Sequence, residues 1–286
     1  MSAPTPPPDT DPAALAAQRS EKYREGVLLT LAYDGAAFAG FAPQANARTV
    51  ASVLMEAIRQ MDPDASSLRV ASRTDSGVHA RGQVACFDTT RNIPPRGWLL
   101  GLSGYLPPQI AVLRVARVEV RFNPSKRARG KTYSYSILQG ALRDPFLESR
   151  SWRIHERLDI ERMRSESQLL LGTHDFIAFR GSQDQRTNTI RTMRSVKLEP
   201  RADNSRCLVF EIQGDRFMFR MVRIIVGTLV DVGRGNCPPG AIQRALQSRD
   251  RNDLGMTAPP DGLFLEQVEL DDGGRDEWPD QYHARP

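Results

Sequence analysis

The spacing of apolar residues along the chain predicts alternating strands and helices. Residues 27–33 (VLLTLAY) are β-compatible and end at the turn signal Asp34-Gly35, which predicts a buried strand. Over residues 50–61 the apolar positions recur every three or four residues behind Thr49, which predicts an amphipathic helix capped by that threonine. The same reasoning predicts further strands over 83–87, 112–120, 132–138, 207–212 and 263–270, and further helices over 159–171, 217–232 and 241–246.

The order of these elements is similar in the two halves of the chain. Strand, helix, strand, strand in each half predicts two α+β units, 26–120 and 121–271, that share one extended, mainly antiparallel sheet with helices on one face. Five of the 20 prolines fall within the first 12 residues, so residues 1–25 are predicted to be a flexible leader. Residues 272–286 are predicted to be a polar tail.

Composition narrows the class of protein. With 286 residues, 40% hydrophobic and 26% charged, the chain is typical of a globular protein and not of a wholly disordered one. No apolar run approaches 18 residues and the first residues lack a signal peptide, so we expect a cytoplasmic protein without a membrane span. The cysteines Cys86, Cys207 and Cys237 form no CxxC pair, which argues against a disulfide framework or a cysteine-based zinc site.

The positive charges are clustered. Between Arg121 and Lys131 there are five cations and no acid, although the formal net charge of the whole chain is only +5. Four more arginines follow within an apolar segment, at positions 216, 220, 223 and 234. Clustering of this kind favours a polyanionic partner such as RNA.

One polar loop between two predicted strands contains candidate chemistry. It reads Arg73-Thr74-Asp75-Ser76-Gly77 and places a carboxylate near a guanidinium, with a glycine that is free to adopt a positive φ. On its own, Asp-Ser-Gly is more often a turn than a catalytic site.

Several strings in collinear order give this loop a context. The segment ASRTDSGVHARGQVACFDT resembles the signature loop of the TruA family of tRNA pseudouridine synthases, and six further strings agree with the same family: LAYDGAAFAGF, LPPQIAV, KTYSYSI, HDFIAFR, FMFRMVRIIVGTLVDVGRG and TAPPDGLFL. The resemblance extends over about 245 residues and leaves out only the two ends of the chain.

The resemblance implies a fold, an activity and a set of site residues. The fold would be the pseudouridine synthase fold, two ferredoxin-like or RRM-like halves on one sheet, and the substrate would be uridines 38, 39 and 40 in the anticodon stem-loop of tRNA. Asp75 matches the family's catalytic aspartate, Tyr133 the tyrosine that stacks on the uracil, Arg73 an arginine that holds the flipped nucleotide, and Arg223 the basic residue that pairs with the catalytic carboxylate. The family acts as a homodimer on tRNA and uses neither a metal nor an organic cofactor.

These residue types suit the reaction. Conversion of uridine to pseudouridine breaks the C1′–N1 bond and rejoins the uracil through C5, so no group has to be supplied. An ionised carboxylate can act on the sugar or the base, a neighbouring guanidinium favours its ionised form, and an aromatic ring can receive a flipped base. Other cations are expected to contact the RNA backbone, namely Arg81, Lys126, Arg127, Arg129, Lys131 and Arg186.

Three positions depart from the family pattern. Phe41 stands where a tryptophan is usual, and Ser103 and Ile224 stand where asparagines are usual. The departures leave open which uridines are modified. Two other functions also remain open: a catalytically silent RNA-binding protein on the same scaffold, and a glycoside or nucleoside hydrolase, which would need a second carboxylate beside Asp75.

Overall fold

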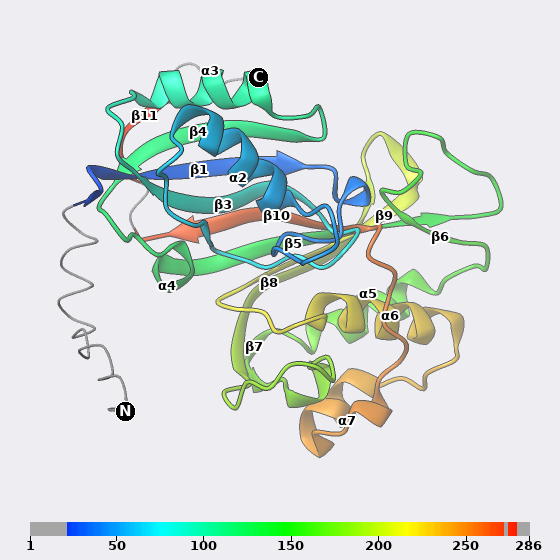
Figure 1. Cartoon of the computed structure of the whole chain (residues 1–286). Helices are drawn as coiled ribbons and strands as arrows, with labels where there is room; N and C mark the ends of the chain where they lie inside the picture. The colour runs from blue at the N-terminus through cyan, green and yellow to red at the C-terminus, as the bar shows by residue number, and fades with distance from the viewer. Residues whose placement is uncertain (1–21, 272–273, 279–286) are drawn as a thin grey trace, which may run out of the picture.

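Eleven strands pair into one sheet in the computed structural model, which describes residues 22–271 and 274–278. The order across the sheet is β11-β4-β1-β3-β10-β5-β9-β8-β7, with β2 beside β3 and β6 beside β5 (Figure 1). Only the β10–β3 and β5–β6 pairs are parallel among the strands described. In chain order the strands are β1 Glu25–Tyr33, β2 Arg69–Val70, β3 His79–Thr89, β4 Ile110–Val118, β5 Ala128–Gln139, β6 Trp152–Ile154, β7 Gly172–Asp175, β8 Ile190–Arg201, β9 Asn204–Gly214, β10 Leu263–Leu270 and β11 Arg275–Trp278.

Two helices pack on the part of the sheet formed by β1, β3 and β4. Helix α2 (Val50–Met61) begins at a capping box in which Thr49 and Ser52 satisfy each other's backbone N–H groups. Helix α3 (Pro95–Tyr105) places Trp98 edge-on against Phe87 of β3, with ring centroids 5.1 Å apart. These contacts build the first part of the hydrophobic core.

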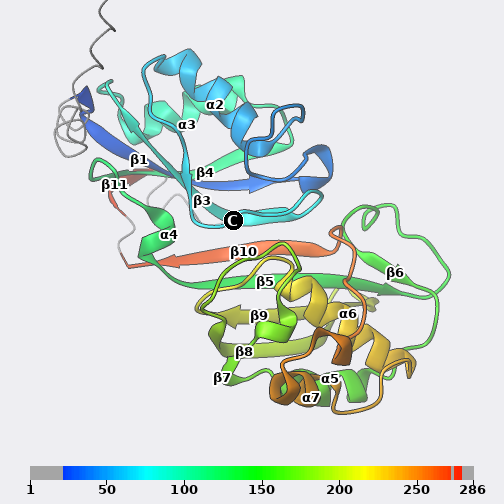
Figure 2. The same ribbon diagram turned by 60° about the horizontal axis from the view of Figure 1, so that its bottom comes forward.

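Three further α-helices lie near β7, β8 and β9 (Figure 2). They are α5 (Ile160–Gln168), α6 (Met221–Arg234) and α7 (Ala241–Ser248), and a short helix α4 (Pro124–Arg127) precedes β5. Helix α6 is the most deeply buried, with 11 of its 14 residues inside the protein. It ends at Gly235, which has a φ of +79°.

Strand β10 lies in the middle of the sheet although it comes near the end of the chain. It pairs in parallel with β3, where Phe264 lies opposite His79, and antiparallel with β5, where Leu265 lies opposite Tyr133. This strand therefore joins the strands on either side of it into one continuous sheet (Figure 2).

The predicted fold class, α+β with a large and mainly antiparallel sheet, is confirmed. The strand at 27–33 and the helix at 50–61 are found within one or two residues of their predicted limits. The predicted leader lies almost wholly outside the described residues, apart from positions 22–25. The predicted tail needs a correction, because residues 275–278 form β11 against β4. No helix in the described parts of the chain is long and apolar enough to cross a membrane.

Candidate active site

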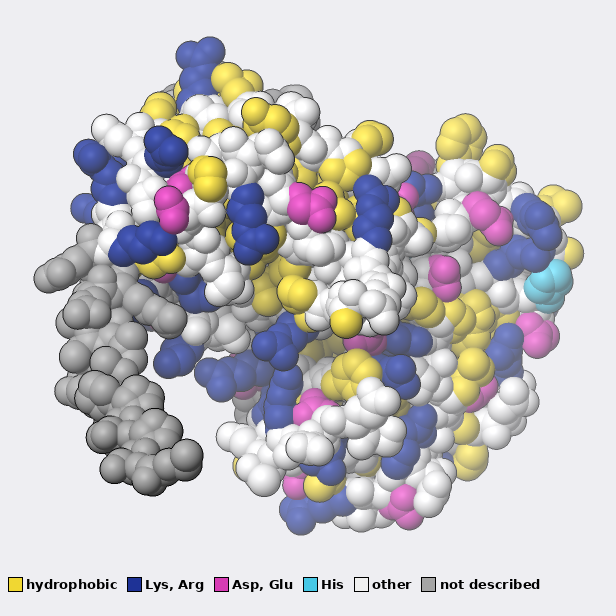
Figure 3. Space-filling model, viewed as in Figure 1, with side chains coloured by type: hydrophobic (Ala, Val, Ile, Leu, Met, Phe, Trp, Pro, Cys, Tyr) yellow, Lys and Arg dark blue, Asp and Glu magenta, His cyan; other side chains and the backbone are white. Residues whose placement is uncertain are grey.

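A cleft of about 1150 Å³ opens on the sheet beside β5. It is lined by the segment from β2 to the Asp75 loop, by α4 and β5, by the loop before β8, and by the start of α6. In Figure 3 lysine and arginine side chains gather in the hollow between the upper and lower parts of the molecule. The cleft thus combines a basic wall with the loop that the sequence singled out.

The Asp75 loop is held by close backbone contacts. The Phe41 N–H donates to the carbonyl of Thr74 at 3.1 Å, and the loop turns through Gly77 at a φ of +80°. Gly40 also has a positive φ of +87°, and a Cβ built on it would lie 2.9 Å from the Thr74 carbonyl oxygen. Only glycine therefore allows the chain at position 40 to approach the loop this closely.

Asp75 forms an ion pair with Arg223. The Nη1 of Arg223, in the first turn of α6, lies 2.9 Å from Oδ2 of Asp75, and the two side chains are 13% and 18% exposed. The Nε of Arg223 also donates to the carbonyl of Ala258 at 2.8 Å, which fixes the plane of the guanidinium. The carboxylate comes from the first half of the chain and its partner from the second.

Tyr133 forms an aromatic wall of the cleft. It lies on β5 at 7% exposure, its hydroxyl is 2.8 Å from Oγ of Ser72, and its ring meets that of Phe217 edge-on at 5.0 Å. Burial and the charge of Asp75 raise the pKa of Tyr133 to about 12, although the Ser72 hydrogen bond acts in the opposite direction. The phenol is therefore protonated at neutral pH.

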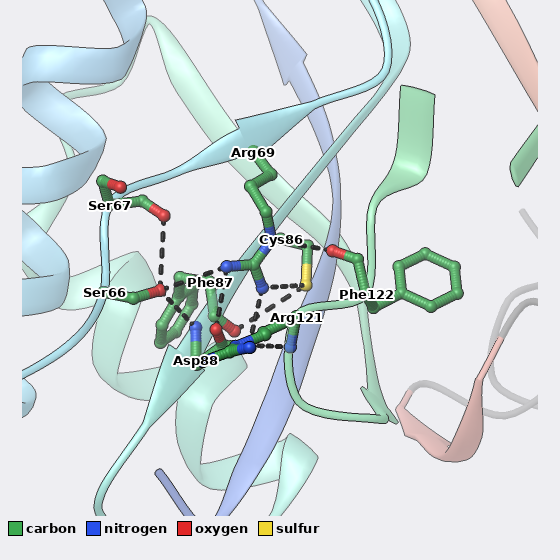
Figure 4. A network of polar contacts seen from close by, with 8 residues as sticks. All are labelled: Ser66, Ser67, Arg69, Cys86, Phe87, Asp88, Arg121 and Phe122. Atoms are coloured by element: carbon green, nitrogen blue, oxygen red, sulfur yellow. Dashed lines mark hydrogen bonds and ion pairs between the residues drawn. The ribbon is translucent and has the colours of Figure 1, made fainter. Parts of the chain in front are cut away.

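A buried ion pair anchors the strand that leads into the Asp75 loop (Figure 4). Arg69 of β2 donates from Nη1 and Nη2 to the two carboxylate oxygens of Asp88 at 2.8 and 2.6 Å, and from Nε to the carbonyl of Phe122 at 2.7 Å. Asp88 also accepts from the Arg121 N–H at 2.9 Å. The network ties β2, β3 and the crossover into β5 together. Burial raises the pKa of the nearby Cys86 thiol to about 12, so this cysteine remains a thiol.

Four of the predicted cations line the cleft, and three do not. Arg73, Lys126, Lys131 and Arg186 are cleft residues. Arg81, Arg127 and Arg129 lie outside the cleft, and each pairs with an acid: Arg81 with Glu266 at 2.6 Å, Arg127 with Glu119 at 2.9 Å and Arg129 with Asp271. Their contact with the RNA backbone stays a prediction.

Several cleft residues were not predicted as site residues. Arg216 and Arg220 belong to the clustered cations of the sequence but were given no place in the site, and of these two and Arg223 only Arg223 lies within α6. Arg220 precedes the helix with a φ of +59°, and both arginines line the cleft. Arg191 and Phe217 also line it. Charge clustering does not by itself place Arg216 and Arg220 in the cleft. No local sequence signal marks Arg191 or Phe217, because the pairing of β8 and β9 with distant segments brings them there.

The three departures from the family pattern occupy different environments. Phe41 is buried in the core at 1% exposure and its backbone supports the Asp75 loop. Ile224 is buried in α6 at 2% exposure. Ser103 is exposed on α3 and donates its hydroxyl to the carbonyl of Leu99.

Carboxylates are few in the cleft. Asp75 and Asp184 are the acids among its described lining residues, and the oxygens of Asp184 accept backbone N–H groups from Arg186 and Phe219 at 3.1 and 2.9 Å. In the described parts of the chain no three His, Cys, Asp or Glu side chains form a group that could hold a metal ion.

Comparison with known proteins gives consistent matches. The profile of a family described as tRNA pseudouridine synthase matches residues 30–124 and 167–271. The chain is 39% identical over 245 residues to "tRNA pseudouridine synthase A" of Myxococcus xanthus, covering 86% of this chain and 92% of that protein. It is 41% identical over 244 residues to the protein of the same name from Citrifermentans bemidjiense, covering 85% and 96%.

Similarity to solved structures is more distant. The crystal structure of the archaeal box H/ACA sRNP Nop10-Cbf5 complex matches with 11% identity and a TM-score of 0.32, over 75% of this chain and 46% of that one. This likeness carries no argument here.

Proposed function

Because the chain belongs to the tRNA pseudouridine synthase family, we propose that its cleft isomerises uridines in the anticodon stem-loop of tRNA, at positions 38, 39 and 40. The observation that carries the assignment of the site is that Asp75 pairs with Arg223 and lines, together with Tyr133, a basic cleft. The reaction is an isomerisation, so product and substrate contain the same atoms.

Asp75 is the group that acts on the uridine. Its carboxylate is 18% exposed and thus accessible from the cleft, while Arg223 holds one oxygen and stabilises the negative charge. Attack at C1′, attack on the base and removal of a proton from C2′ all begin with this ionised carboxylate. In each case the C1′–N1 bond breaks, a C1′–C5 bond forms and the hydrogen of C5 is replaced by one on N1.

Tyr133 receives the flipped base. A uridine stacked within RNA has to leave the stack before a side chain can reach its C1′, and stacking on an aromatic ring is worth about 1–3 kcal/mol per base. The edge contact with Phe217 and the hydrogen bond to Ser72 keep the ring in one orientation. Arg73, which is exposed and lines the cleft, would hold the displaced nucleotide.

The two rival functions are less well supported by the site. A hydrolase of the two-carboxylate type needs a second acid, and the only other one among the described cleft residues, Asp184, is engaged with backbone N–H groups. A silent RNA-binding protein would not need an aspartate held by an arginine from the opposite half of the chain.

The test is pseudouridine formation on an unmodified tRNA transcript, mapped by carbodiimide–alkali primer extension. We expect modification at positions 38–40 with the wild-type protein, a loss of at least about a thousandfold in rate for Asp75→Asn, and tRNA affinity within about threefold of wild type. Asp203→Asn is the matched control, because this aspartate is 66% exposed and pairs with Arg201 on the surface. Modification by the Asp75→Asn protein at the wild-type rate would refute the assignment, and release of free uracil would favour the hydrolase.

We further propose that the protein works in the cytoplasm as a homodimer that grips one tRNA. The support is the resemblance of the chain to its family. Light scattering coupled to size exclusion, with and without tRNA, tests the dimer, and a monomer in both samples would refute it.

A further inference from the structure

One wall of the cleft carries four cations that the catalytic proposal does not use. Lys131 lies on β5, Arg191 at the start of β8, Arg216 just after β9 and Arg186 in the loop before β8. The strands β5, β9 and β8 are neighbours, and Lys131 is paired with Gly214 of β9, which is itself paired with Met193 of β8. The four residues therefore gather at one end of three adjacent strands.

Arg191 is the most buried member of this group. It is only 5% exposed, and its Nη atoms donate to the carbonyls of Ile190 and Asn188 at 2.6 and 2.9 Å. Its buried Nε has no hydrogen-bond partner among the described residues. Burial of a guanidinium that has no ion-pair partner and one unused N–H donor costs free energy, unless a ligand accepts a hydrogen bond from that donor.

Lys131 is fixed in position by one hydrogen bond. Its ammonium donates to the carbonyl of Ala71 at 2.8 Å, which leaves two N–H donors for another acceptor. Two residues further along β5 is Tyr133, and Phe217, the aromatic partner of Tyr133, directly follows Arg216. The group thus adjoins the place where the uracil is proposed to stack.

Like charges act on one another within this group. The pKa of Lys131 is lowered to about 8 by burial and by the charges of Arg186 and Arg216. The pKa of Arg191 is also lowered, chiefly by burial; the charge of Asp215 opposes this shift, and the charges of Arg186 and Arg216 add to it. Two acids lie near the group. Asp184 accepts backbone N–H groups and pairs with Nε of Arg186 at 3.6 Å, and Asp215 accepts from the Thr192 and Arg216 N–H groups at 3.0 and 2.7 Å.

We propose that Lys131, Arg186, Arg191 and Arg216 form a subsite for one phosphodiester group of the RNA, next to the flipped uridine, and that filling it is coupled to protonation of Lys131. The proposal rests on the proposed function in naming RNA as the ligand and in placing the flipped uridine at Tyr133. An anion placed among the four cations would satisfy the donors of Lys131 and Arg191 and would relieve their mutual repulsion.

The coupling has a definite sign. The phosphate favours the charged ammonium, so the pKa of Lys131 is higher in the complex than in the free protein. Above a pH of about 8 the free protein has lost this proton, and binding must take it up again. Affinity for RNA therefore decreases as the pH rises from 7 to 9.

The test compares tRNA binding by Asp75→Asn proteins, which keep the substrate unconverted, at pH 7, 8 and 9 and at several salt concentrations. With Lys131 present we expect the Kd to rise by up to about tenfold between pH 7 and pH 9. Lys131→Arg keeps a positive charge that does not titrate in this range. Between pH 7 and pH 9 its Kd should therefore change by less than about twofold more than the Kd of the control variant does. The control is Lys197→Met, since Lys197 is 64% exposed and pairs with Glu211.

Lys131→Met should weaken binding and lower the slope of log K against log salt by about 1 relative to Lys197→Met. A Lys131→Arg protein with the wild-type pH dependence, or a Lys131→Met protein with an unchanged salt slope, would overturn the subsite. Neither result bears on pseudouridine formation, which is measured separately with Asp75 intact, so a failure of the proposed function is distinguishable from a failure of the subsite.

Discussion

Replacing Asp88 by asparagine should destabilise the protein by about 3 kcal/mol, because it leaves the Arg69 guanidinium without its anion. Asp88 is 2% exposed and receives two charge-assisted hydrogen bonds from Arg69, at 2.8 and 2.6 Å. Removal of one partner from a buried ion pair costs about 3–5 kcal/mol. The lower end applies, since the Arg69 side chain is 22% exposed and water can solvate part of it, and since an asparagine oxygen can still accept from the Arg121 N–H.

The assay is urea unfolding followed by tryptophan fluorescence, for which the buried Trp98 is a suitable reporter. A double-mutant cycle with Arg69→Met isolates the pair. The double variant should be more stable than the sum of the two single changes predicts, with a coupling of at least about 2 kcal/mol. A coupling below about 0.5 kcal/mol is what an exposed ion pair gives, and it would refute the interpretation of this network as a buried anchor of the loop strand.

Three other changes test the candidate site. Arg223→Lys keeps the positive charge, but an ammonium cannot donate to Asp75 and to a backbone carbonyl in one plane as the guanidinium does. Single-turnover pseudouridine formation should therefore slow by about 10–100-fold with the tRNA Kd unchanged. A rate equal to that of the wild type would mean that the charge alone suffices. Gly40→Ala should lower the free energy of unfolding by about 1–2 kcal/mol and slow the reaction, because φ is +87° and the new methyl group lies 2.9 Å from a carbonyl of the Asp75 loop. The control is Gly104→Ala on α3, where no atom lies within 4 Å of the new Cβ; this change should be neutral or stabilising by up to about 1 kcal/mol. Burial lowers the pKa of His79, so the unfolded chain binds a proton at a higher pH than the folded protein does, and stability should decrease as the pH falls below about 6.5. Urea unfolding midpoints measured from pH 7.5 to 5.5 test this. A His79→Asn protein with the same pH dependence would assign the effect to other groups.

Periodic segments could be predicted from the sequence, and segments with an interrupted period could not. The helix at 50–61 follows its apolar spacing almost to the residue. Strand β8 was missed because a bulge between Met193 and Ser195 breaks its alternation, so its buried residues Met193, Val196 and Leu198 are first three and then two positions apart. Helix α6 starts four residues later than predicted, since Arg220 adopts a left-handed conformation that apolar spacing cannot show.

The candidate site was predictable to the extent that its residues carry a local motif. Asp75, Tyr133 and Arg223 were identified from strings that resemble a family. The structure places Asp75 and Tyr133 in one cleft and pairs Asp75 with Arg223. Arg191 could not be found in this way, because its place in the same cleft as Lys131 depends on the pairing of β5, β9 and β8 across about 60 residues of chain. Charge clustering in the sequence likewise did not distinguish Lys131 from Arg129, which an acid on a distant segment holds away from the cleft.

The late position of β10 in the chain has a consequence for biosynthesis. A ribosome synthesises residues 263–270 after β1 to β9 and after α6, yet this strand occupies the middle of the sheet and has β3 and β5 as its neighbours. Until it emerges, both of those strands present open edges. A chain that ends before residue 263 lacks the strand that joins β3 to β5, so we expect it to be unable to act on RNA although it contains both the aspartate and the arginine.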